Sequence, residues 1–135
     1  MRIFLFDIDG VLVKPFGYRK AFFETCKWII ERGKLEINLP AEDIPALYES
    51  HGITSEWDML AITAGIMVQF VCKKNDQSLH ANNFEEALVE LTALDKIYKN
   101  IDFRENIKLI SASFQTHEIP SVGVLNAGRK YFSNV

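Results

Sequence analysis

The feature that most constrains the fold is an uninterrupted apolar run at residues 3–6, followed by Asp7, Asp9 and Gly10. Because no polar residue alternates with the apolar ones, the run is typical of a strand covered on both faces, as in a parallel α/β sheet. Gly10 permits a sharp turn directly after such a strand. A single strand cannot satisfy its own backbone hydrogen bonds, so the run also needs partner strands.

The rest of the chain has mainly helical periodicity. Ser55 and Asn83 stand at helix N-cap positions, and Gly33 stands where a helix C-terminal glycine belongs. Apolar residues recur at spacings of three and four between these signals. We expect helices over 18–32, 41–50, 55–72, 83–98 and 122–132, whereas 106–114 fits a strand or a helix.

Composition bounds the class of protein. The chain has 135 residues, one ordinary domain's worth, and its formal net charge of −3 gives no reason to expect nucleic acid or an anionic membrane as a partner. The apolar stretch at 59–72 is shorter than the roughly 20 residues that span a bilayer. Two cysteines, Cys26 and Cys72, make no disulfide framework, which indicates a reducing compartment. These features predict a soluble, cytoplasmic protein.

Asp7 and Asp9 carry the only chemistry that the pattern specifies. Open α/β sheets place ligands at the carboxyl ends of their strands, where these two side chains are expected. One carboxylate can attack as a nucleophile while the other gives and takes protons, provided that their surroundings differ. A divalent cation would screen the negative pair, and oxygen ligands of this kind suit Mg²⁺.

The apolar run with Asp7, Asp9 and Gly10 resembles the first signature of the haloacid dehalogenase (HAD) superfamily, and most of all its phosphohydrolases. The resemblance implies an α/β fold with a Rossmann-like core and Mg²⁺-dependent hydrolysis of a phosphate monoester. It makes Asp7 the nucleophile that forms an aspartyl-phosphate, and also a metal ligand. It makes Asp9 the general acid and base, and a metal ligand through its backbone carbonyl. The dehalogenase branch lacks the second aspartate, so Asp9 favours phosphoryl chemistry.

The same resemblance implies a division of the chain into parts. Residues 1–16 would be the first core strand and catalytic loop, 17–120 an α-helical cap, and 121–135 the start of a return to the core. Ser111 or Ser113 resembles the serine of the family's second signature, but no basic or acidic signature follows. We therefore expect the N-terminal part of a longer enzyme, inactive alone, whose first strand is completed by self-association or by a core segment in trans.

Four residues are candidates for binding a small phosphorylated metabolite: Gly10, Tyr18, Arg19 and Trp57. Tyr18 and Arg19 follow the motif and could reach an anionic substrate, or they could belong to a solvated hinge. Trp57 could contact substrate from a cap loop, or it could pack in the cap core at a helix N-terminus. Two other functions remain open, namely phosphotransfer by a mutase of the same fold and a non-catalytic helical interaction module.

Overall fold

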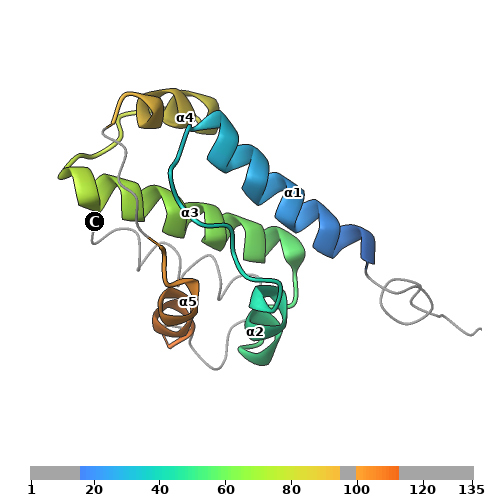
Figure 1. The fold of residues 1–135 in the computed structure, drawn as a ribbon. Helices are drawn as coiled ribbons and strands as arrows, with labels where there is room; N and C mark the ends of the chain where they lie inside the picture. The colour runs from blue at the N-terminus through green and yellow to red at the C-terminus, as the bar shows by residue number, and fades with distance from the viewer. Residues whose placement is uncertain (1–15, 95–99, 113–135) are drawn as a thin grey trace, which may run out of the picture.

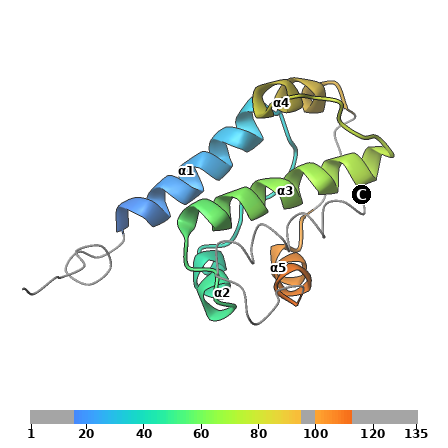
Figure 2. The same cartoon turned by 180° about the vertical axis from the view of Figure 1, so that it is seen from behind.

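The computed structural model describes residues 16–94 and 100–112, which form five α-helices (Figure 1). Two long helices lie side by side and begin at the same end of the molecule, as both views show (Figures 1 and 2). The two helices that pack against each other beneath α3 are α2 and α5. The bounds are α1 (Phe16–Arg32), α2 (Ile44–Ser50), α3 (Glu56–Asn75), α4 (Phe84–Thr92) and α5 (Phe103–Ser111).

Side-chain caps explain where three of the helices begin. The Ser55 hydroxyl accepts from the Asp58 backbone N–H at 3.4 Å, and the Asn83 side chain accepts from the Glu86 N–H at 2.9 Å. Both caps, which satisfy otherwise unpaired backbone N–H groups, confirm the sequence prediction. Asp102 caps α5 in the same way.

The end of α1 differs in detail from the sequence prediction. The residue in the left-handed conformation is Lys34, with φ of 50°, and not Gly33. The N–H of Leu35 bonds to the carbonyl of Ile30 at 2.9 Å, which closes the last turn. Space is tight at Gly33 for another reason, because a Cβ there would lie 3.1 Å from both the Ile29 carbonyl oxygen and the Leu35 side chain.

The core lies where α1, α2, α4, α5 and the segment after α1 pack against α3. Among the residues that the structure describes, the core contains one buried pair of hydroxyl groups, those of Tyr48 and Thr63. A hydrogen bond of 2.9 Å joins them. Thr63 in turn donates to the Met59 carbonyl at 2.7 Å. The apolar members include Phe22, Cys26, Ile29, Ile44, Ile53, Ile62, Ile66, Met67, Leu88, Leu91, Phe103, Ile107 and Ile110.

The α/β fold class that the family resemblance implies is wrong for this structure. The described residues form helices and contain no strand, and no Rossmann-like core is present among them. The ambiguous segment is helix α5, because Phe103, Ile107 and Ile110 fall on one buried helical face behind the Asp102 cap. Ser111 therefore ends a helix and does not follow a second strand.

Several sequence predictions fall outside the described residues. These are the strand at 3–6, Asp7, Asp9 and Gly10, Ser113, and the helix at 122–132. The division at residues 16, 120 and 121 is not tested either, although α1 to α5 all fall within 16–111. Over the part of the chain that is described, none of the helices combines the length and the apolar character needed to cross a membrane.

Candidate functional site

An open groove with a volume of about 790 Å³ runs along α3 between α1 and α4. Its lining extends from Trp57 to Cys72 on α3, which corresponds to roughly 22 Å of helix at 1.5 Å per residue. Thr25 and Ile29 of α1 form one wall, and Phe84 of α4 forms part of the other. This volume lies in the range of roughly 300–1,000 Å³ that is usual for small-molecule sites.

The groove exists because α3 presents small side chains on this face. Ala61, Ala64 and Gly65 line it and leave room that larger residues would fill. Two aromatic side chains border the space and remain in contact with solvent, since Trp57 is 80% exposed and Phe84 is 45% exposed. The result is an apolar channel with aromatic edges.

Gln69 is the one lining residue that is both polar and deeply buried, with 7% of its surface exposed. No hydrogen bond to its side-chain amide occurs within the described part of the chain. Its amide nitrogen and oxygen are not among the fully buried side-chain atoms that lack a partner, so both keep contact with solvent. Gln69 also lines a smaller recess of about 310 Å³ beside α5, which is bordered by Lys73 and Lys74.

Cys72 also lines the groove, but it is a poor nucleophile. Burial and the nearby Glu90 carboxylate raise the pKa of its thiol, which lowers the fraction of reactive thiolate. Burial raises the pKa of the other free cysteine, Cys26, to about 12. Both thiols are therefore packing groups rather than catalytic ones at neutral pH.

The structure brings three of the predicted substrate-binding residues to one end of the bundle, where α1 and α3 both begin (Figures 1 and 2). Tyr18 and Arg19 lie in the first turn of α1, and Trp57 lies in the first turn of α3. Arg19 donates to both carboxylate oxygens of Glu49, at 3.0 and 3.3 Å, and so ties α1 to α2. The high exposure of Trp57 shows that its packing in the cap core, one of the two expectations, is wrong.

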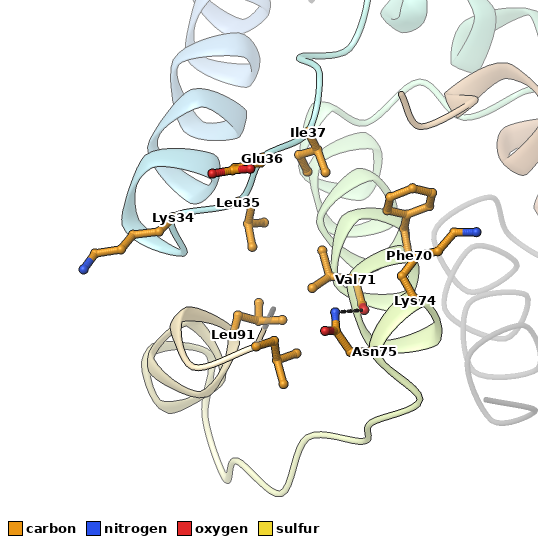
Figure 3. A pocket seen from close by; sticks show the side chains of 10 residues that line it. Lys34, Leu35, Glu36, Ile37, Phe70, Val71, Lys74, Asn75 and Leu91 are labelled. Atoms are coloured by element: carbon orange, nitrogen blue, oxygen red, sulfur yellow. Dashed lines mark hydrogen bonds between the residues drawn. The ribbon is translucent and has the colours of Figure 1, made fainter. Parts of the chain in front are cut away.

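Another hollow lies at the far end of the bundle (Figure 3). It has almost no free volume. Leu35, Val71 and Leu91 approach one another there, while the amine of Lys34 points away into solvent. The remaining volume of about 20 Å³ suffices for about one water molecule. This hollow is a packing gap and not a binding site.

Metal ligands are not grouped in the described residues. No cluster of three or more His, Cys, Asp or Glu side chains occurs in 16–94 and 100–112. Asp7 and Asp9, the predicted ligands, lie outside these ranges. Their carboxylate and carbonyl oxygens are hard donors of the kind that Mg²⁺ prefers.

Comparison with protein-family models, curated proteins and solved structures finds no match to the chain. The groove was not anticipated from the sequence, where 59–72 reads as a uniformly buried helix. The signal that could have indicated it is the spacing of Ala61, Ala64 and Gly65, which places small residues together on one face.

Proposed function

We propose that the chain takes part in Mg²⁺-dependent hydrolysis of small phosphate monoesters, with Asp7 as nucleophile and Asp9 as general acid and base. The observation that supports this most is the motif itself: two aspartates two residues apart, preceded by an apolar run and followed by a glycine, directly before α1. This is the pattern that resembles the phosphohydrolases of the HAD superfamily. The five helices would act as a unit that borders the reacting group.

The reaction has two balanced steps. An oxygen of Asp7 attacks phosphorus, the ester P–O bond breaks, and Asp9 gives its proton to the leaving alcohol. Asp9 then takes a proton from water, whose oxygen attacks phosphorus and releases inorganic phosphate and free Asp7. When bound, Mg²⁺ supplies positive charge that offsets the charge of the aspartates and of the phosphoryl group.

The length of the connection limits where Asp7 can lie. Phe16, at the start of α1, is nine positions after Asp7 in the sequence. A fully extended chain of that length spans at most about 32 Å. The end of the bundle that holds Tyr18, Lys20 and Trp57 is the end at which the chain enters α1 from the motif. Lys20 is exposed and forms no ion pair with another described residue, so its charge is available to a phosphate.

The test is a phosphatase assay on the full product of the gene, with a panel of small phosphate monoesters. We expect hydrolysis that needs Mg²⁺ and falls by about 10³-fold or more in Asp7→Asn, because the nucleophile is lost. Asp76→Asn is the matched control, since Asp76 is exposed at the end of α3 in the left-handed conformation, which asparagine also adopts. Hydrolysis that survives Asp7→Asn, or no hydrolysis of any ester, would contradict the proposal.

For the 135 residues alone we expect little or no turnover. The groups that stabilise a transferred phosphoryl have no assigned positions in the sequence, and such groups carry much of the catalysis. The same assay on residues 1–135 tests this. Turnover that Asp7→Asn abolishes would show that these residues already hold a working site.

Three further points belong to the proposal. Transfer of the phosphoryl group to a second sugar phosphate rather than to water is the alternative within the same chemistry, and product analysis separates the two. The location would be the cytoplasm, which the free thiols of Cys26 and Cys72 support. A non-catalytic binding module is the second candidate function, and the apolar groove is the observation that favours it.

A further inference from the structure

We infer that the groove between α1, α3 and α4 binds a small neutral amphiphile, whose apolar body lies along α3 and whose amide or similar polar group bonds to Gln69. This inference does not depend on hydrolysis at Asp7, and it holds for a catalytic or a non-catalytic chain. It rests on three observations, which concern the shape of the groove, the one largely buried polar residue that lines it and its lack of charge.

The shape suits an elongated apolar group. The small side chains of Ala61, Ala64 and Gly65 let a ligand approach the backbone of α3 closely, and Leu60 and Val68 add apolar surface beside them. Trp57, at the α3 N-terminus, is 80% exposed, and a ligand in the groove would cover part of its ring. Burial of such surface favours binding in proportion to the apolar area removed from water.

Gln69 supplies the directional contact. The residue is 7% exposed and lines the groove, and its side-chain amide has no hydrogen-bond partner in the described ranges. The amide atoms keep contact with solvent, so a ligand group can reach them. A side-chain amide offers two N–H donors and one carbonyl acceptor. A primary amide on the ligand would match both functions at once, whereas an alcohol or ketone would match one. A few polar groups of this kind inside an apolar pocket fix the orientation of its ligand.

The charge of the ligand follows from the lining. No Asp, Glu, Lys or Arg stands among the described residues that line the groove. An ionised group placed there would lose water without gaining an opposite charge. The recess on the other side of Gln69 differs, because Lys73 and Lys74 border it and would favour an anion. Charge therefore distinguishes ligands that enter the groove from ligands that enter the recess.

The experiment uses three probes with the same eight-carbon chain: octanamide, octanoate and octylammonium. Trp28, the other tryptophan, is changed to phenylalanine so that Trp57 is the sole indole reporter. We expect octanamide to shift Trp57 fluorescence saturably, and each charged probe to bind at least tenfold more weakly. Tighter binding of octanoate would place the ligand at the recess and overturn the inference. No saturable response to octanamide would also overturn it.

Two variants and a control locate the site. Gln69→Met keeps the side-chain length and removes both hydrogen-bonding functions, so octanamide should bind at least tenfold more weakly. Ala61→Phe places a ring in the groove from an exposed position, so the same probe should be displaced without loss of the fold. Val89→Ala removes an exposed apolar side chain of α4 that does not line the groove and should leave binding unchanged. Unchanged affinity in both groove variants would rule out this site, and circular dichroism checks that each variant is folded.

Discussion

The two faces of α3 have similar apolar character but very different surroundings. On the core face, Met59, Ile62, Ile66 and Met67 are each at most 3% exposed. On the groove face, the helix presents alanines and a glycine. An open groove of about 790 Å³ lies there between α1 and α4. Apolar composition therefore predicts that neighbouring elements can pack against a helix. The sizes of its side chains decide whether that packing fills the space.

Truncation of one large apolar side chain on each face should give the largest difference between them. We expect Ile66→Ala to lower the free energy of unfolding by about 2–5 kcal/mol, since it leaves a cavity in the closed core. Leu60→Ala removes the same number of carbon atoms from a half-buried side chain that lines the groove. Its effect should be about 1 kcal/mol or less, because less surface returns to water. Urea unfolding of both variants measures this, and equal losses would mean that the groove is closed in solution.

The buried hydroxyl pair gives a smaller test of the closed face. Tyr48 donates to Thr63, which donates onward to the Met59 carbonyl, so the two hydroxyls are not equivalent. Tyr48→Phe removes one hydrogen bond and should cost about 0.5–1.5 kcal/mol. Thr63→Val leaves the Tyr48 hydroxyl buried without a partner and should cost about 1–3 kcal/mol. A larger loss for Tyr48→Phe in thermal or urea unfolding would contradict this order.

The smallest expected effect is a pH dependence of the groove wall. The Asn82 backbone N–H bonds to the Glu86 carboxylate at 2.9 Å and lowers the pKa of Glu86 below its ordinary value of 4.5. A lowered pKa in the folded state contributes stability above pH 4.5, and this contribution is lost as the pH falls through the folded value. Burial instead raises the pKa of Asp58 near the start of α3, so acid acts there in the opposite direction.

We therefore expect acid to weaken α4 more than α3. Amide protection factors, measured between pH 6 and pH 3.5, should fall at residues 86–91 with little change at 62–67. Glu86→Gln should reduce this dependence on pH, because the amide does not ionise. A loss of protection that is uniform over both helices would mean that Glu86 has no special part in it.

Much of the helical structure follows from local patterns. Ser55 and Asn83 were predicted as caps from their positions before apolar periodic segments, and both accept the expected backbone hydrogen bonds. Periodicity indicated α1 and α4, although α4 ends at Thr92 and not at the expected 98. The helix α3 is apolar on both faces and was indicated by its cap and its long apolar run. The segment of α5 was ambiguous because a short apolar run fits a strand equally well until its neighbours are known.

The long-range features were not accessible in the same way. One expectation for Trp57 was packing in the cap core at a helix N-terminus, yet its side chain is 80% exposed in the first turn of α3. The groove depends on how far α1 and α4 stand from each other, which no local pattern specifies. The motif at Asp7 and Asp9 predicted chemistry but led to an α/β fold that the described residues do not have.

The parallel arrangement of α1 and α3 has a consequence for the folding rate. The core residues Cys26 of α1 and Ile66 of α3 are separated by forty positions in sequence, because the chain must return along the bundle through the 33–43 segment and α2. Two consecutive helices joined by a tight turn would instead meet through short loops. Since folding slows as contacts become more distant in sequence, this bundle should fold more slowly than an up-and-down bundle of equal length. Its transition state would already have to contain the closed crossover that brings the two long helices together.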